Sequence, residues 1–238
     1  LKELIPKGFI DIHSHILPGI DDGAKNVKES LKLVMQMREL GFSKLIATPH
    51  TYPGLFHNTS KTIKDSYLQL KKKSNYVENV FYASEYMVDL SLVKKAEEKS
   101  LLTLKKNYVL IEMSYFSAVN NLYEIIFQLR MNDYIPILAH PERYVFLHNN
   151  KEITKIKNAG CKLQVNLLSS IGYYGVEVSK QTDYLLTNNL VDFVGSDIHN
   201  QSHISAFSKK IIIKNIRKLA ELIEKNIEFN WFLSSEYP

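Results

Sequence analysis

The chain has 238 residues, of which 45% are hydrophobic and 23% charged, and its formal net charge is +5. This length and composition predict one globular domain over residues 1–238, large enough for an α/β barrel. A single cysteine, Cys161, excludes an internal disulfide and favours a reducing, cytoplasmic compartment. No apolar run reaches the ~18 residues of a membrane span, and we expect no secretory signal.

In chain order, seven apolar runs alternate with patterns of helical spacing. We expect strands at Phe9–His13, Lys44–Thr48, Val80–Glu85, Tyr108–Glu112, Ile135–His140, Lys162–Asn166 and Phe193–Asp197. Helical patterns cover Val27–Leu40, Asn120–Met131, Glu152–Asn158, Val178–Asn189 and Lys210–Lys225. Continuous apolar runs are typical of parallel strands buried on both faces, and repeated strand–helix units imply right-handed crossovers.

Residues able to bind metal stand at the C-terminal ends of these predicted strands. An open sheet concentrates its site at one switch point, whereas a barrel gathers all strand ends at one mouth. We therefore predict an α/β fold in which seven strands form a TIM-like (β/α)7 barrel. The candidate metal ligands are His13, His15, Asp22, His50, Glu85, Glu112, His140, Asp197 and His199.

The spacing and surroundings of these residues indicate a polynuclear metal site. His13 and His15 are one residue apart, which places both imidazoles on one face of a strand. Glu85 and Glu112 lie in apolar runs, where a carboxylate is costly unless it is paired or bound to metal. Neutral imidazoles combined with carboxylates suit manganese, iron, zinc or cobalt.

The aspartates near the first histidines have alternative interpretations. Asp11 precedes His13 on the same strand face, where we expect it to orient an imidazole. Asp21-Asp22-Gly23 is typical of a turn with a helix N-cap. The same loop would also bring the Asp22 carboxylate over the metals.

The remaining histidines and several aromatic residues lie outside the predicted ligand set. We expect no metal ligand among His57, His148 and His203. The histidines at 57 and 203 lie in loops expected at the mouth, where contact with substrate is an alternative. Tyr52, Phe56 and Tyr115 lie in similar loops and either stack on a substrate ring or pack within the loops.

The basic residues are dispersed along the chain, apart from Lys71–Lys73. Dispersion favours a lysine-rich surface over a nucleic-acid groove, so we expect no nucleic-acid partner. Attraction to an anion such as a phosphorylated peptide is the alternative interpretation of the net charge.

The motifs Asp-x-His-x-His at 11–15, Thr-Pro-His at 48–50, His-Pro-Glu-Arg at 140–143 and Ser-Asp-x-His-Asn at 196–200 are similar to those of the PHP (polymerase and histidinol phosphatase) superfamily. Together with Asp21-Asp22-Gly23, they more closely resemble the bacterial PHP-type protein-tyrosine phosphatases of capsule and exopolysaccharide biosynthesis. The resembling segments span nearly the whole chain. The resemblance implies a distorted seven-stranded barrel with three divalent metals, often manganese. It also implies a phosphotyrosine-bearing protein substrate, such as a bacterial tyrosine kinase.

The resemblance further implies a role for each site residue. One metal would bind His13, His15, Glu85 and Asp197, a second would bind Glu85, Glu112 and His140, and a third would bind Asp22, His50 and His199. Arg143 matches the family arginine that grips the phosphate, and its planar fork suits a phosphoryl group. Close relatives carry another arginine after Ser-Asp-x-His-Asn, but Gln201–Ser205 contains none, so His203 or a lysine would replace it.

The expected mechanism is attack of a metal-activated hydroxide on phosphorus, because bound metal lowers the pKa of water from about 15.7 toward neutrality. No phosphoenzyme is needed, and Cys161 lacks the Cys-x5-Arg pattern of cysteine phosphatases. The leaving phenol has a pKa of about 10 and needs little protonation. Asp11 and His199 are the candidate proton donors.

Alternative functions remain open at this point. A small-molecule phosphomonoesterase, such as a histidinol phosphatase, would use the same residues. A nuclease of the superfamily and a non-catalytic metal-binding scaffold are further alternatives. Assembly into a homo-oligomer through Val27–Leu40 is also open.

Overall fold

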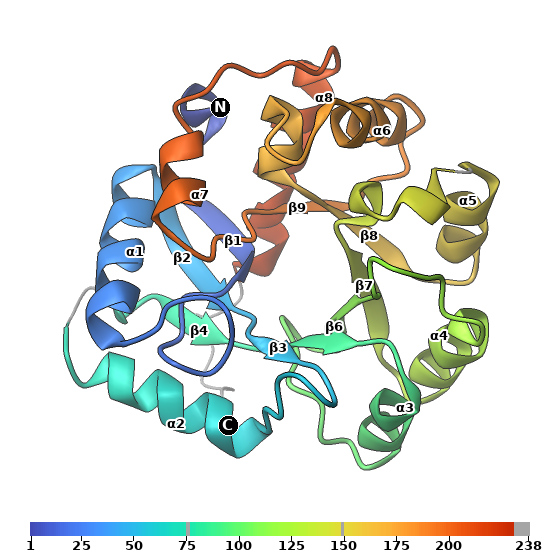
Figure 1. Cartoon of the computed structure of the whole chain (residues 1–238), viewed down its shortest axis with the longest axis horizontal. Helices are drawn as coiled ribbons and strands as arrows, with labels where there is room; N and C mark the ends of the chain where they lie inside the picture. The colour runs from blue at the N-terminus through green and yellow to red at the C-terminus, as the bar shows by residue number, and fades with distance from the viewer. Residues whose placement is uncertain (75–76, 149, 231–238) are drawn as a thin grey trace.

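The computed structural model describes residues 1–74, 77–148 and 150–230. Its strands surround a common centre and its helices lie outside them (Figure 1). The strands are β1 (Phe9–Ser14), β2 (Phe42–Ala47), β3 (His50–Thr51), β4 (Val80–Tyr82), β5 (Glu85–Met87), β6 (Tyr108–Glu112), β7 (Ile135–Ala139), β8 (Lys162–Asn166) and β9 (Phe193–Gly195). The α-helices are α1 (Val27–Glu39), α2 (Ser60–Lys71), α3 (Leu90–Glu97), α4 (Leu122–Met131), α5 (Asn150–Asn158), α6 (Val176–Thr187), α7 (Gln201–Ala206) and α8 (Ile216–Lys225).

Backbone hydrogen bonds join the strands into two sheets, with the orders β1-β2-β4 and β3-β5-β6-β7-β8-β9. The strand pairs within both sheets are parallel. This arrangement confirms the predicted α/β fold with parallel strands. The pairing does not match one closed ring of seven continuous strands, because the two sheets do not close on each other.

Two breaks in the chain explain the division into two sheets. The first is at Pro49, which has no N–H to donate and follows the predicted strand Lys44–Thr48; β2 ends before it and β3 begins after it. The prediction of a continuous strand over Val80–Glu85 is wrong, since the chain breaks between β4 and β5. At this break, the Ser84 hydroxyl donates to the carbonyl of Pro49 at 3.0 Å. The two breaks therefore lie side by side, and they direct His50 and Glu85 toward the same point.

The side chain of Asn226 connects the first strand to the last. This residue is buried at the start of the short helix η6 (Asn226–Phe229). Its Nδ2 donates to the carbonyls of Ile10 and Val194 at 2.9 and 2.8 Å. Its Oδ1 accepts from the N–H of Val194 at 3.3 Å. One amide side chain thus joins β1 to β9, and an isolated parallel bridge between Ser14 and Ile198 joins the segments at the C-terminal ends of the same strands.

Helix α2 was not predicted, although the sequence contains its signals. Its buried residues Ile63, Tyr67 and Leu70 recur at helical spacing, and Thr59 forms a capping box with Thr62. Helices α3 and α7 were also missed, because they are short and offer few turns of periodic pattern.

The predicted helix Lys210–Lys225 is too long at its start. Helix α8 begins at Ile216, because the Asp183 carboxylate accepts hydrogen bonds from the N–H groups of Lys214 and Asn215. These bonds hold the preceding connection outside the helix.

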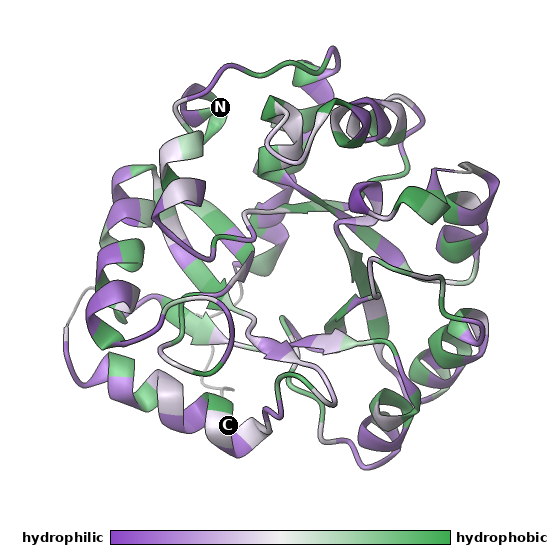
Figure 2. Cartoon of the chain, in the orientation of Figure 1, coloured by the Kyte–Doolittle hydropathy of each residue, from purple (hydrophilic) through white to green (hydrophobic). Residues whose placement is uncertain are grey.

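Two hydrophobic clusters hold the elements together. The larger packs strands against helices, whose outward faces are largely hydrophilic (Figure 2). The smaller packs among the strands and η6, and it includes Leu110 and Ile137. These residues precede Glu112 and His140 in the chain, so apolar packing lies beneath the polar strand ends. Within the described residues, no helix is long and apolar enough to cross a membrane.

We predict that Asn226→Ala lowers the free energy of unfolding by about 3 kcal/mol, because it leaves buried backbone groups of β1 and β9 unpaired. Denaturant unfolding measures this change. The matched control is Asn188→Ala, which removes an exposed asparagine whose Nδ2 bonds only within its own helix end. Equal unfolding free energies for the two variants would contradict the role of Asn226 in closure.

Candidate metal centre

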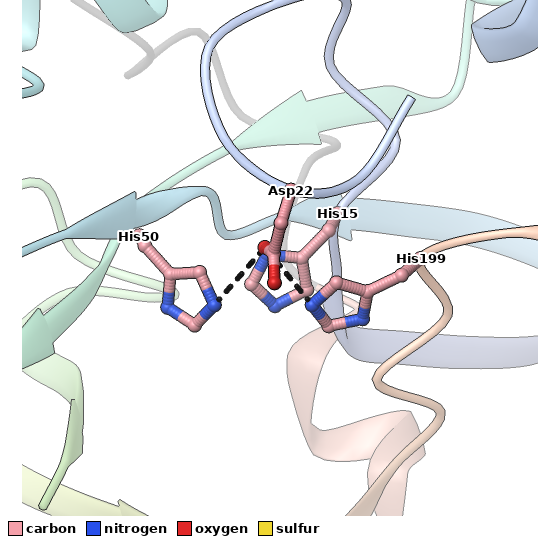
Figure 3. A group of neighbouring side chains, drawn as sticks. All are labelled: His15, Asp22, His50 and His199. Atoms are coloured by element: carbon pink, nitrogen blue, oxygen red, sulfur yellow. Dashed lines mark ion pairs between the residues drawn. The ribbon is translucent and has the colours of Figure 1, made fainter. Parts of the chain in front are cut away.

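All nine predicted ligands lie together at the C-terminal ends of the strands. Their nitrogen and oxygen atoms form four overlapping groups, and the atoms of each group lie within 4.8 Å of one another. The groups are His13, Glu85 and His140; His13, His15 and Asp197; His50, Glu85 and Glu112; and His15, Asp22, His50 and His199. Figure 3 shows the last group, in which the Asp22 carboxylate lies among three imidazoles.

Glu85 lies at the centre of the cluster. Its Oε2 is 3.2 Å from His13 Nε2, 3.4 Å from His15 Nε2 and 3.1 Å from His50 Nδ1. Its Oε1 is 3.1 Å from His140 Nε2. A carboxylate shared in this way is suited to bridging two cations.

Asp197 is oriented by contacts on both of its oxygens. Its Oδ1 is 3.3 Å from the Nε2 atoms of both His13 and His15. Its Oδ2 accepts from Arg143 Nη1 at 2.8 Å and from Asn166 Nδ2 at 2.9 Å. One oxygen therefore faces the imidazoles while the other is fixed by two donors.

Left-handed backbone at two of these residues directs their side chains. His140 follows β7 with φ 36°, and Asp197 follows β9 with φ 52°. Such a conformation costs roughly 1 kcal/mol or more for a residue with a Cβ, and it is typical of functional sites. The observed strands β7 and β9 therefore stop short of these residues, and the predicted ends at His140 and Asp197 are too long.

Asp22 completes the outer part of the cluster. Its side chain is 58% exposed, and its Oδ1 lies 3.5 Å from His50 Nε2 and 3.4 Å from His199 Nε2. The rings of His15 and His199 stack with their centroids 3.8 Å apart. The position of Asp22 therefore agrees with the interpretation in which the loop brings its carboxylate over the site.

The grouping in space differs in part from the partition implied by the resemblance. Glu112 lies closest to His50, with Oε1 2.7 Å from Nδ1, and it is grouped with His50 and Glu85. His15 belongs both to the group with Asp197 and to the group with Asp22.

Buried atoms that face one another without a well-directed hydrogen bond indicate that the cluster fits cations. His50 Nδ1 lies close to Glu85 Oε2 and Glu112 Oε1, but within the described residues none of these three buried atoms has a hydrogen-bond partner of acceptable geometry. Buried polar atoms are costly without such partners. Imidazoles together with carboxylates form a donor set that suits divalent transition metals.

The ionisation of these residues shows how the cluster balances its charge without metal. Burial opposes charge on His50, and so does His15, but Glu112 and Glu85 outweigh them and raise its pKa to about 10. Burial also opposes charge on Glu85, yet the neighbouring imidazoles hold its pKa well below the usual range. Burial lowers the pKa of His140 to about 4, so this imidazole is neutral.

Two residues orient the imidazoles, and neither was assigned this role from the sequence. Asp21 Oδ2 lies 2.8 Å from His15 Nδ1 and also accepts from the N–H of His50 at 3.2 Å. Gln164 Oε1 lies 2.8 Å from His13 Nδ1. The buried polar Gln164 within a β-strand was a usable signal, whereas Asp21 resembles any turn aspartate.

The expectation that Asp11 orients an imidazole is not matched by its contacts. Asp11 is buried, and its carboxylate accepts from the Ser196 N–H at 2.8 Å and from the Ser196 hydroxyl at 2.5 Å. Burial raises its pKa to about 6, against the opposing effect of Ser196. Asp11 therefore fastens β1 to the segment after β9, while Asp21 and Gln164 orient the rings.

A cavity of about 460 Å³ opens above the ligands, and Arg143 lines it. The Arg143 guanidinium lies over the rings of Tyr115 and Tyr174, 4.7 and 4.1 Å from their centroids. His203 also lines this cavity, and its Nδ1 accepts from the N–H of His199 at 3.2 Å. Burial raises the pKa of Cys161 to about 12, and this thiol does not line the cavity.

Comparison with known proteins identifies relatives of this chain. The sequence pattern of the capsular polysaccharide synthesis proteins CpsB/CapC matches residues 9–229. The chain belongs to the CpsB/CapC family. The tyrosine-protein phosphatase CpsB of Streptococcus pneumoniae is 31% identical over 202 residues, covering 81% of this chain and 83% of that protein.

Solved structures agree with membership of the CpsB/CapC family. One solved chain comes from the structures of YwqE from Bacillus subtilis and CpsB from Streptococcus pneumoniae, which are described as unique metal-dependent tyrosine phosphatases. It matches with a TM-score of 0.76 and 26% identity, and the match covers 91% of this chain and 94% of the solved chain. Histidinol phosphate phosphatase from Lactococcus lactis shares the fold, with a TM-score of 0.54, 13% identity and coverage of 92% and 93%. These matches confirm the resemblance inferred from the motifs.

We predict that Asp21→Asn lowers the affinity for manganese by about 10- to 100-fold, because the amide does not orient His15 and His50 as the carboxylate does. Titration calorimetry of the metal-free protein measures this affinity. The matched control is Asp65→Asn, which alters an exposed aspartate paired only with Lys61. An unchanged affinity in Asp21→Asn would show that the carboxylate does not support the site.

We also predict that metal binding tightens as pH rises. The pKa of His50 is raised to about 10, so its imidazole is protonated at neutral pH in the metal-free protein. A metal binds the neutral ring, so a metal bound at His50 must displace its proton, and the free-energy cost of removing that proton falls as pH rises toward this pKa. Calorimetry between about pH 6 and 8 in buffers of different ionisation enthalpy measures the proton release. Equal affinities at all pH values would contradict this account.

Proposed function

We propose that this protein is a metal-dependent tyrosine-protein phosphatase. The observation that carries the proposal is the position of Arg143, whose guanidinium lines the cavity directly beside the cluster and contacts Asp197 at 2.8 Å. A planar cation beside a carboxylate–imidazole cluster suits a phosphoryl group bound by both. The names of the CpsB and YwqE relatives support the same activity.

We further propose the nine clustered residues as ligands of three divalent ions, with manganese as the resident metal. When bound, such ions stabilise the charge on phosphoryl oxygens and lower the pKa of water. The parallel strands support one distorted seven-stranded barrel as the framework, formed by a single domain over residues 1–238. In this framework, β2 with β3 and β4 with β5 count as two broken strands.

Arg143 binds phosphate in this proposal without leaving its present position. Its Nη1 donates to Asp197, but a guanidinium has five N–H donors, and the others are available to a phosphoryl oxygen. The rings of Tyr115 and Tyr174 both pack against this guanidinium. Asp11 does not line the cavity, so the proposal gives it a positioning role instead of proton donation.

The substrate we propose is a phosphotyrosine-bearing protein, in particular a tyrosine kinase of polysaccharide synthesis in the cytoplasm. The support is the family match to capsular polysaccharide synthesis proteins, together with a cavity that opens at the surface of the molecule, where a substrate protein can reach it. The leaving group is then a phenol, whose pKa of about 10 reduces the need for a proton donor.

We predict manganese-dependent hydrolysis of a phosphotyrosyl peptide from the tail of the cognate kinase. His13→Ala and Asp197→Ala should each reduce kcat/KM by more than about 100-fold, because each removes a proposed ligand. Asp65→Asn serves as the control and should retain activity. Preference for histidinol phosphate, or bound metal without any phosphoester hydrolysis, would overturn the proposed function.

A further inference from the structure

Polar and apolar side chains line the same cavity. Arg143, His199 and His203 lie in segments that follow β7 and β9 and supply polar atoms. Leu55 and Phe116 follow β3 and β6, and these strands flank β5 in the sheet. Strand β6 is also the neighbour of β7, so the segment that carries Phe116 lies next to the one that carries Arg143.

Leu55 and Phe116 are exposed although they are large and hydrophobic. The exposed fractions are 62% for Leu55 and 98% for Phe116. Both side chains nevertheless line the cavity above the cluster of candidate metal ligands. Apolar surface at the rim of a polar site is typical of a surface that a ligand covers.

Two other aromatic residues that line the cavity, Phe56 and Tyr115, are already packed against protein groups. The Phe56 ring stacks on His50 with centroids 5.3 Å apart and an interplanar angle of 13°. The Tyr115 ring lies under the Arg143 guanidinium and stacks on His140. Phe56 and Tyr115 therefore already contact residues of the site itself.

Hydrogen bonds hold the backbone that carries the two exposed side chains. In the turn that contains Leu55, the N–H groups of Leu55 and Phe56 both donate to the carbonyl of Tyr52, at 3.1 and 2.8 Å. The Ser114 hydroxyl accepts from the N–H of Phe116 at 3.2 Å. Because hydrogen bonds fix the backbone of both turns, little backbone freedom is lost when the side chains contact a ligand.

We propose that Leu55 and Phe116 bind the phenyl ring of phosphotyrosine and select it over phosphoserine. This proposal rests on the proposed phosphatase function and names the groups that determine its substrate class. Arg143, Leu55 and Phe116 line one cavity, so a phosphotyrosine whose phosphoryl group lies beside Arg143 would place its ring against the two apolar side chains. A phosphoserine side chain has no ring to bury there, so it gains nothing from this surface.

The test compares Leu55→Ser, Phe116→Ser and the double variant with the wild type in the manganese-loaded protein. The substrates are a phosphotyrosyl peptide, the same peptide with phosphoserine, and phenyl phosphate. We expect the double variant to raise KM for both aryl substrates by about tenfold, since it removes apolar surface that only a ring covers. Its kcat and its kcat/KM for phosphoserine should not change.

Binding provides a second measurement that does not depend on turnover. A peptide with a non-hydrolysable phosphonate in place of the phosphotyrosine phosphate should bind the double variant about tenfold more weakly by calorimetry. The matched control is Met131→Ser, because Met131 is 65% exposed on α4 and does not line the cavity. Since both target residues are exposed, the variants should unfold at the wild-type temperature.

The outcomes separate this proposal from the proposed function. If the wild type hydrolyses no phosphotyrosine substrate, the phosphatase function fails. If it hydrolyses the peptide but the double variant behaves like Met131→Ser, the function stands and the role of Leu55 and Phe116 is overturned. An effect on the peptide without one on phenyl phosphate would also overturn it, because the ring would then not be the group bound.

Discussion

The buried carboxylate of Glu85 is the constraint on which the rest of the site depends. Its Oε2 lies within 3.4 Å of nitrogens on His13, His15 and His50, which come from β1 and its end and from β3. A buried negative charge requires compensation by protons or cations. Protonated imidazoles supply this compensation without metal, and divalent ions would supply it when they displace those protons. The chain therefore has to bring several distant segments to within a few ångströms of one carboxylate.

Irregular backbone is the means by which the fold meets this requirement. The adjacent breaks at Pro49 and Ser84 turn His50 and Glu85 toward each other. Left-handed backbone at His140 and Asp197 directs these two side chains into the cluster. These departures interrupt the ladders that would close a regular barrel. Side chains add to the remaining pairing: Asn226 joins Ile10 of β1 to Val194 of β9, and Asp11 bonds to Ser196 beside them. Backbone hydrogen bonds join the end of β1 to the segment after β9, where Asp197 donates to His13 and His15 donates to Ile198.

The same physics explains what could be predicted from the sequence. Strand positions and the convergence of ligand residues were predictable, because apolar runs ending in histidine or carboxylate leave few other arrangements. The break within Val80–Glu85 was not, since Ser84 becomes a break only through its bond to Pro49 on another segment. The orienting role of Asp21, the actual partner of Asp11 and the exposure of Phe116 also depend on contacts between distant segments. Sequence periodicity does not encode such contacts.

The presence of exposed apolar side chains in the same cavity as the proposed ligands has a consequence for specificity. The proposed ligands are fixed by a dense set of mutual contacts, so a substitution at one of them disturbs several others. Leu55 and Phe116 contact solvent, and their turns are held by Tyr52 and Ser114 instead of by any proposed ligand. Their side chains can therefore change without altering the distances around Glu85. A fold with this arrangement can keep one phosphoryl-binding centre and vary the group that carries the phosphate by altering two exposed positions.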